Sequence, residues 1–365
     1  RFVAQHGANI RYSEERKHWL IWTGKVWAWD LGARITELAK ETVSSIYREA
    51  ADALDDNDRK KLAAHALRSE TESRISAMIG LAQSPPQIIV KPLDLDANPM
   101  LLNVSNGTID LRTGLLLSHS REKLQTILVP IDYIPDAPCP LWLSFLERVT
   151  GGNTGLMDYL RRCVGYSLTG ITTTQVLFFL YGLGSNGKST FTTTIRKLLA
   201  GYGDTVPFDL FLLKDRDGGG PKEGLANLSG KRFIAASELE DGRRLAISLI
   251  KDLTGGESIK ADRKYEHAFE FRPMAKFWLT ANHKPTVTDT TLSIWRRVKL
   301  IPFTVTIPLE EADPDLPAKL ESELPGILAW AVRGCLEWQK YGLGEPETVS
   351  VATASYRREQ DVLAD

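Results

Sequence analysis

The segment QVLFFLYGLGSNGKSTFTTTIRKLLAG, residues 175–201, decides the fold class of this chain. It opens with a short continuous apolar run, which is typical of a strand buried on both faces. A glycine-rich loop follows, and then Phe191, Ile195, Leu198 and Leu199 recur at the spacing of one helix face. A buried strand, a glycine-rich loop and an amphipathic helix in this order predict an α/β fold.

The loop GLGSNGKST fits the P-loop pattern G-x-x-x-x-G-K-[ST]. Its glycines let backbone N–H groups approach phosphate oxygens, next to a helix N-terminus that favours anions. Lys188 would reach the β- and γ-phosphates, and the Ser189 hydroxyl would bind Mg²⁺. We therefore predict that ATP and Mg²⁺ bind at Gly182, Gly184, Ser185, Asn186, Gly187, Lys188, Ser189 and Thr190.

Two acids follow the next predicted strand, in KRFIAASELED (231–241). In a P-loop ATPase one such acid orients Mg²⁺ through water and another polarises the attacking water. Here Leu239 separates Glu238 from Glu240, so the two roles stay open between them. We favour Glu238 on the metal side because it is the first residue past the strand. The alternative is a pair of solvated acids in a surface turn.

Two further segments carry polar residues at strand ends. KFWLTANHKP (276–285) ends a predicted strand in Asn282, which can hold the attacking water and sense the γ-phosphate, although asparagine also forms turns. SIWRRVKLIPF (293–303) places Arg296 and Arg297 just before the last predicted strand. An arginine there can act on the nucleotide of a neighbouring subunit. The alternative is a pair of surface arginines beside a strand.

Residues 257–271 read as a β-hairpin with a basic and aromatic centre. Such a tip can grip a phosphate backbone, with an aromatic ring against sugar or base. The candidate DNA-binding residues are Lys260, Arg263, Lys264 and Tyr265. A solvated charged hairpin is the alternative.

Composition is ordinary for a soluble globular protein: 43% hydrophobic and 25% charged residues among 365. The net charge of −1 excludes a global basic field, so any contact with nucleic acid must be local. No apolar run approaches the roughly 20 residues of a membrane span. Three scattered cysteines predict reduced, buried thiols in a cytoplasmic protein. Because the first residue is Arg1, we expect a fragment of a longer polypeptide.

We predict three domains: an α+β domain at 1–139, an α/β ATPase domain at 140–308 and a helical segment at 309–365. The first begins with a hairpin that turns at residues 23–25 and holds four tryptophans, for which packing is a more frequent use than base stacking. Helical periodicity then runs from residue 35 to 81, with DDNDRKK (55–61) as a break between two helices. This domain would serve as a collar for oligomerisation or contact DNA.

Taken together, the motifs resemble a superfamily III helicase of the phage and plasmid primase–helicase family, which includes the poxvirus primase–helicase. The segments that carry the resemblance are GLGSNGKST, RFIAASELE, LTGGESIKADRK, TANHKP and SIWRRVKLIPF. It covers residues 100–310 well and the first hundred loosely. It implies an AAA+-like fold, a homo-hexameric ring and ATP-driven translocation, usually 3′ to 5′, that unwinds duplex DNA during replication.

The resemblance also implies residue roles. Lys188 and Ser189 would bind nucleotide, Glu238 the metal, and Asn282 would be the sensor. Arg297 would be the finger acting on the next subunit, with the Arg296–Arg297 pair leaving that choice ambiguous, and Lys264 would grip DNA. Implied partners are single-stranded or forked DNA and a primase domain in the same parent chain, in the cytoplasm of a bacterial host or an infected cell. Two alternatives stay open: an AAA+ origin-binding or assembly ATPase that does not unwind, and a small-molecule kinase.

Overall fold

The computed structural model describes residues 1–213, 223–237, 242–261, 269–288 and 291–362. The chain divides into two compact units, one formed by residues 1–97 and 119–127 and the other by residues 98–118 and 128–365. These units are defined by contacts and do not coincide with the three predicted domains, whose limits stay predictions. Among the described residues, no helix is both long and apolar enough to cross a membrane.

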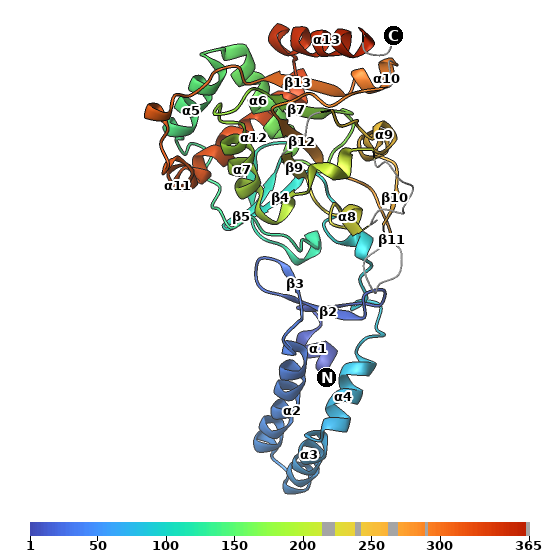
Figure 1. Cartoon of the computed structure of the whole chain (residues 1–365). Coiled ribbons are helices and arrows are strands. Elements are labelled where there is room, and N and C mark those ends of the chain that lie inside the picture. Colours follow the sequence, from blue (N-terminus) through green and yellow to red (C-terminus); the bar gives the residue numbers. More distant parts are fainter. Residues whose placement is uncertain (214–222, 238–241, 262–268, 289–290, 363–365) are drawn as a thin grey trace. The chain divides into compact units, whose positions relative to one another are not determined.

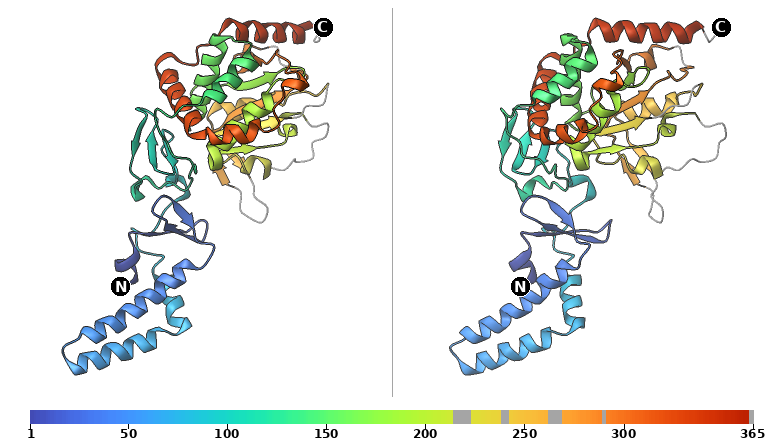
Figure 2. Two further views of the ribbon diagram at one scale, coloured as in Figure 1. Left: turned by 90° about the vertical axis from the view of Figure 1, so that its left-hand side faces the viewer. Right: turned by 60° about the vertical axis from the view of Figure 1, so that its left-hand side comes forward.

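The first unit combines a small antiparallel sheet with a group of helices. Its strands pair in the order β1-β2-β3, and the predicted hairpin with its turn at residues 23–25 is confirmed. The elements are α1 (Phe2–His6), β1 (Ile10–Ser13), β2 (His18–Trp22), β3 (Trp27–Trp29), α2 (Arg34–Asp52), α3 (Asp56–Ser69) and α4 (Glu72–Leu81). In both views of Figure 2, α2 and α3 run side by side in blue.

The charged stretch DDNDRKK is not the break that the sequence predicted. Helix α2 ends at Asp52, and α3 begins inside the stretch, at Asp56. The carboxylate of Asp55 accepts a hydrogen bond from the Asp58 backbone N–H (2.9 Å) and so caps α3. Acids in a first turn also favour a helix N-terminus. The stretch therefore starts a helix, and α4 makes a third helix where two were expected.

The tryptophans of the hairpin mainly pack. Because side chains alternate along a strand, Trp19 lies on the sheet face that packs, together with Tyr12, against the helices. It puts Trp27 on the opposite face, buried with Leu20 and Val90. Packing, the more frequent use, is thus confirmed for the two buried rings.

The second unit is built on a parallel sheet. Among the described residues five strands pair in the order β13-β7-β12-β9-β8, all parallel. They are β7 (Leu177–Tyr181), β8 (Gly203–Thr205), β9 (Phe233–Ser237), β12 (Lys276–Ala281) and β13 (Val298–Pro302). The four long predicted strands, and the α/β class, are confirmed. Because the strands are parallel, all their carboxyl ends meet at one edge.

Helices cover both faces of this sheet, and Figure 1 shows α5, α6, α7 and α12 on one side of the strands and α8 to α10 on the other. On the first side an aromatic cluster joins the sheet to the helices, with Trp278 of β12 packed against Phe178, Phe191 and Phe233. The second side is mainly aliphatic and includes the buried ring of Tyr356 from α13. The helices are α5 (Pro140–Thr150), α6 (Thr154–Ser167), α7 (Lys188–Leu199), α8 (Glu223–Ala226), α9 (Ile247–Gly255), α10 (Leu292–Trp295), α11 (Leu316–Ser322), α12 (Leu324–Tyr341) and α13 (Glu347–Val362).

Two short antiparallel sheets complete the unit. Strands β4 (Leu101–Val104), β5 (Gly107–Asp110) and β6 (Leu115–Leu117) pair in the order β4-β5-β6. Strands β10 (Ile259–Ala261) and β11 (Phe269–Phe271) form the predicted hairpin. Its centre, with Arg263, Lys264 and Tyr265, lies outside the described residues.

Two buried cations stabilise the amino edge of the large sheet. Arg232 donates to the carbonyls of Leu168 and Leu101 (2.7 and 2.8 Å), and Lys276 donates to those of Thr169 and Ile171. These carbonyls follow the end of α6 or belong to β4. Cations suit the negative end of a helix dipole. Arg232 and Lys276 therefore anchor the loop that leads into β7. The candidate site lies at the opposite, carboxyl edge of the sheet.

Candidate nucleotide site

The loop between β7 and α7 depends on two glycines. A Cβ atom at Gly182 would lie 2.1 Å from the Phe303 carbonyl oxygen, so no side chain fits there. Gly187 has a φ of +82°, and a Cβ there would lie 2.5 Å from a Val149 methyl. Only glycine adopts this conformation at no steric cost. The Gly-x-x-x-x-Gly spacing is therefore required by the packing of the loop.

The carboxyl end of β13 holds this loop in place. The Phe303 N–H donates to the Tyr181 carbonyl (2.8 Å), and the Ile307 N–H donates to that of Ser185 (2.7 Å). The Asn186 side-chain amide donates to the Phe303 carbonyl (3.0 Å). The glycine-rich loop is thus hydrogen-bonded, from its start at Tyr181 to Asn186, to the segment that follows β13.

Lys188, the first residue of α7, is buried with its ammonium group directed at three neutral oxygens. Its Nζ donates to the Gly182 carbonyl (2.6 Å), to Asn186 Oδ1 (2.9 Å) and to Asn282 Oδ1 (3.2 Å). Burial lowers the pKa of this ammonium group. Its three N–H donors are all used, and Asn282 reaches it from the end of β12 because β12 pairs with β7.

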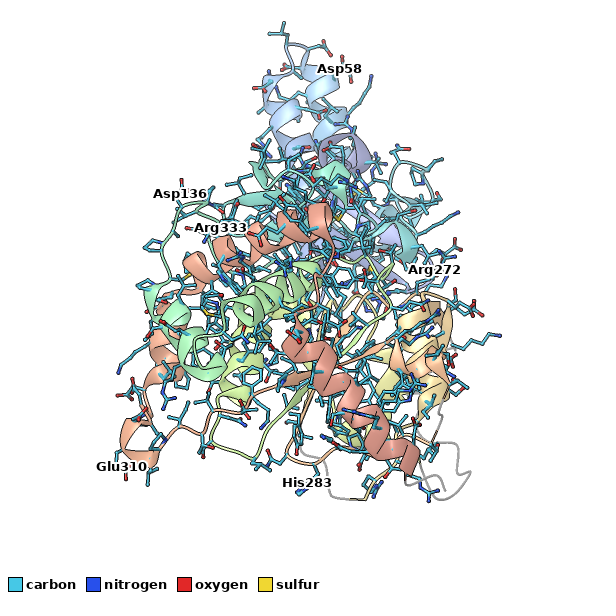
Figure 3. The ribbon with its side chains drawn as sticks, turned by 90° about the horizontal axis from the view of Figure 1, so that it is seen from above. Asp58, Asp136, Arg272, His283, Glu310 and Arg333 are labelled. Atoms are coloured by element: carbon cyan, nitrogen blue, oxygen red, sulfur yellow. The ribbon has the colours of Figure 1, made fainter. Side chains whose placement is uncertain are left out.

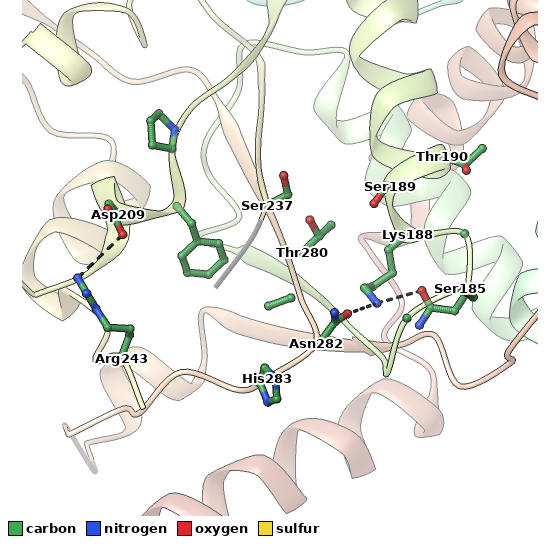
Figure 4. Close-up of a pocket in the computed structure, with 16 residues that line it drawn as sticks. Ser185, Lys188, Ser189, Thr190, Asp209, Ser237, Arg243, Thr280, Asn282 and His283 are labelled. Carbon is green, nitrogen blue, oxygen red and sulfur yellow. Dashed lines mark hydrogen bonds and ion pairs between the residues drawn. The ribbon is translucent and has the colours of Figure 1, made fainter. Parts of the chain in front are cut away.

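A polar cavity of about 860 Å³ opens beside Lys188 along the carboxyl edge of the sheet. The predicted residues 184–190 line one side of it, with Ser189 at the N-terminus of α7 (Figure 4). The other lining residues are Pro207, Phe208, Asp209, Ser237, Arg243, Thr280, Ala281, Asn282 and His283. A cavity of this volume is within the range of small-molecule sites.

The two predicted acids, Glu238 and Glu240, lie outside the described residues. In the sequence they come one and three residues after Ser237 of the cavity wall. Mg²⁺ is held in such sites by one or two carboxylates, a hydroxyl and the phosphates. The Ser189 hydroxyl, exposed at the cavity, fits that donor set. Among the described residues no cluster of three or more His, Cys, Asp or Glu could hold a metal by itself.

The two candidate finger arginines differ in burial and lie at the amino edge of the sheet, just before β13. The Arg297 guanidinium is buried, donates to Thr254 Oγ1 (3.1 Å) and the Ser293 carbonyl (2.6 Å), and has its pKa lowered by that burial. Arg296 is exposed and donates to Gln175 Oε1 (3.0 Å). Of the two, Arg296 is the one that a second copy can reach.

Lys260, the described member of the predicted DNA-binding group, is on β10. Its ammonium group is 3.5 Å from Glu270 of β11, and its side chain is 74% exposed. An ion pair so open to water holds the lysine weakly.

Sequence reasoning missed Arg243, Asp209 and the role of α13. Arg243 comes two residues after the acidic run, which is the one signal that pointed to it. Helix α13 holds the loop that leaves β12: Lys284 pairs with Glu359 (2.7 Å), and the Val287 N–H donates to Gln360 (2.9 Å). The Tyr356 hydroxyl donates to the Pro285 carbonyl. Figure 3, seen from above, shows His283 of this loop close to α13.

Comparisons with known proteins agree with this architecture. Residues 1–151 match the family model "D5 N terminal like", and residues 180–297 match a family of unknown function, DUF5906. A putative helicase (L207/L206) of Acanthamoeba polyphaga mimivirus is 25% identical over 296 residues, which are 74% of this chain and 30% of that protein. Primase D5 of fowlpox virus is 24% identical over 318 residues, or 81% of this chain and 36% of that protein.

The chain thus spans about a third of these relatives' length. Among solved structures, the NrS-1 C-terminal region superposes with a TM-score of 0.53 at 10% identity, covering 97% of this chain and 74% of that one. At this identity the likeness concerns the fold alone. The matches confirm the resemblance to the primase–helicase family.

Proposed function

We propose that this chain, given its similarity to primase–helicases, is the ATP-driven motor of a DNA helicase that acts in replication. The observation that carries the proposal is the contact of Lys188 Nζ with Asn282 Oδ1 (3.2 Å) at the head of the cavity. A γ-phosphate held by Lys188 would lie next to Asn282, whose amide can hold the attacking water. The loop lysine and a polar strand end are thereby joined in one site.

The remaining chemistry follows from the residues around the cavity. The N-terminus of α7 and the backbone N–H groups of the loop favour the anionic phosphates. The Ser189 hydroxyl, with Glu238 or Glu240, would hold Mg²⁺, which when bound neutralises charge that develops on the β- and γ-oxygens. The other acid would polarise the water that Asn282 orients. The chain's own part is to position the reactants and to supply fixed dipoles.

We further propose a ring of identical copies around DNA. The cavity opens at the carboxyl edge of the sheet and exposed Arg296 lies at the amino edge. A head-to-tail arrangement would bring these two different surfaces together, which is the geometry of a cyclic assembly. Arg296 is then the finger that the geometry favours, since Arg297 is held within its own chain. Lys260, Arg263, Lys264 and Tyr265 of the β10–β11 hairpin would grip DNA phosphates.

The test compares Lys188→Ala with Lys197→Ala. Both lysines are on α7, but Lys197 pairs with Glu321 away from the cavity. We expect Lys188→Ala to lower Mg²⁺-dependent ATP hydrolysis by about 100-fold or more, since more than one charge-assisted hydrogen bond to phosphate is lost. Lys197→Ala should keep the wild-type rate. Equal hydrolysis by wild type and Lys188→Ala would refute the site.

A forked DNA duplex separates the helicase from its alternative. The wild type should unwind it with ATP, and Lys188→Ala should not. Hydrolysis with assembly on DNA but without strand separation would instead favour the origin-binding or assembly ATPase.

A further inference from the structure

We infer that Arg243 binds the γ-phosphate of a nucleotide held in the same chain, as a second cation facing Lys188 across the cavity. The inference rests on the proposed nucleotide function and deepens it, because it adds a residue that reads the third phosphate. Among the described residues that line the cavity, Lys188 and Arg243 are the lysine and arginine side chains. Each comes from a different end of the pocket.

The cavity runs in one direction from the loop. It passes the ends of β12 and β9 at Thr280 and Ser237 and reaches Asp209 next to β8. Figure 4 shows Arg243 and Asp209 on the side opposite Lys188, with Ser237 and Thr280 between them. Phosphates bound at the loop therefore have this line of polar side chains beside them.

The γ-phosphate, rather than the base, points toward Arg243. Ser237 ends β9 and lines this part of the cavity, and the predicted acids Glu238 and Glu240 follow it in the sequence. Acids that serve the metal and the attacking water must be near the terminal phosphate. Arg243 follows Glu240 by three residues and lines the same part of the wall. We therefore assign Arg243 to the phosphate end of the cavity.

The backbone of Arg243 is fixed relative to Asn282. Its carbonyl accepts from the Thr286 N–H (2.8 Å), and the Leu245 N–H donates to the Thr286 carbonyl (3.0 Å). Thr286 is on the loop that begins at Asn282. Successive side chains of an extended segment point to opposite sides, which agrees with Arg243 facing the cavity and Arg244 being exposed. Arg244 is thus a matched control.

The contact between Arg243 and Asp209 is weak. Arg243 Nη2 is 3.9 Å from Asp209 Oδ1, and the two side chains are 38% and 76% exposed. An ion pair this long and this open is weak. A guanidinium makes two parallel hydrogen bonds to a phosphate, which are stronger because both partners are charged. A γ-phosphate would therefore compete well with Asp209.

The experiment measures binding of Mg²⁺-ADP and of the Mg²⁺ complex of a non-hydrolysable β,γ-imido ATP analogue, by calorimetry, to four proteins. These are the wild type, Arg243→Ala, Arg243→Lys and Arg244→Ala, each checked for an unchanged thermal midpoint. Arg243→Ala should weaken the ATP analogue about tenfold or more and change ADP binding less than about twofold. Arg243→Lys should recover part of the loss, and Arg244→Ala should bind both ligands as the wild type does.

An equal loss for both ligands would place Arg243 at the base, the ribose or the inner phosphates and would overturn the inference. So would unchanged binding of the analogue by Arg243→Ala. If the wild type binds neither ligand, the proposed function fails together with this inference. If the wild type binds both and Arg243→Ala does not discriminate, only this inference fails.

Discussion

The contact between helix α13 and the loop that begins at Asn282 leads to a sharp prediction for Glu359→Gln. Glu359 holds Lys284 through two hydrogen bonds (2.7 and 2.8 Å), and the Lys284 side chain is only 18% exposed. Removing the charge of a half-exposed partner should lower the free energy of unfolding by about 1 to 2 kcal/mol. A loss of about 1 to 2 kcal/mol would raise the population in which the Asn282 loop is detached from α13 by about five- to thirtyfold.

A matched ion pair provides the control. Lys299 Nζ and Glu345 Oε2 lie 2.5 Å apart, the two side chains are 21% and 27% exposed, and the pair joins β13 to the segment before α13 rather than to the Asn282 loop. Glu345→Gln should therefore cost a similar stability but leave Asn282 in place. We expect ATP hydrolysis at saturating ATP to fall about three- to tenfold for Glu359→Gln, because small displacements of positioning groups slow the reaction, and less than twofold for Glu345→Gln. Thermal unfolding measures stability, and equal losses of activity in both variants would refute the reasoning.

Two further predictions concern the loop and the thiols. Gly187→Ala should lower the free energy of unfolding by about 2 to 4 kcal/mol and weaken nucleotide binding, because the φ of +82° and the contact 2.5 Å from Val149 both oppose a side chain. Gly184→Ala, with nothing within 4 Å of the added Cβ, should cost only the backbone strain. Equal thermal midpoints for the two variants would contradict this. The three cysteines are buried. Burial raises the pKa of Cys335 to about 12 and that of Cys163 well above its usual range. Ellman's reagent should therefore react with these thiols at pH 8 only after the protein unfolds. Because unfolded thiols release protons at a lower pH than these folded ones, the free energy of unfolding should fall as the pH rises above about 9. A thiol that reacts rapidly with the reagent in the folded protein would be inconsistent with this packing.

The parts of this protein that sequence predicts well are those with local signals. The strand, loop and helix of residues 175–201 follow from an apolar run, two glycines and a helical spacing, and all three form as expected. The nearness of Asn282 to Lys188 also follows from a simple rule, since polar residues after parallel strands gather at one edge. The rule does not say which strands are neighbours, and the pairing of β12 with β7 decides the contact.

The parts that sequence does not predict depend on packing between distant segments. Arg297 was expected to face outward, yet its guanidinium is held by Thr254, 43 residues earlier in the chain. Arg243 lines the cavity, and its carbonyl accepts a hydrogen bond from the Thr286 N–H, also 43 residues away. The grip of α13 on the Asn282 loop joins residues more than 70 positions apart. No local pattern records such pairings.

The three neutral partners of Lys188 have a consequence for turnover. A buried ammonium group that lost its ligand and found no substitute would be an uncompensated charge, which costs about 3 to 5 kcal/mol. Here the departing phosphate would be replaced by the oxygens of Gly182, Asn186 and Asn282, so the ammonium group would keep three acceptors. Each cycle then becomes an exchange of acceptors around one nitrogen, and the Asn282 amide changes partner as the phosphate arrives and leaves.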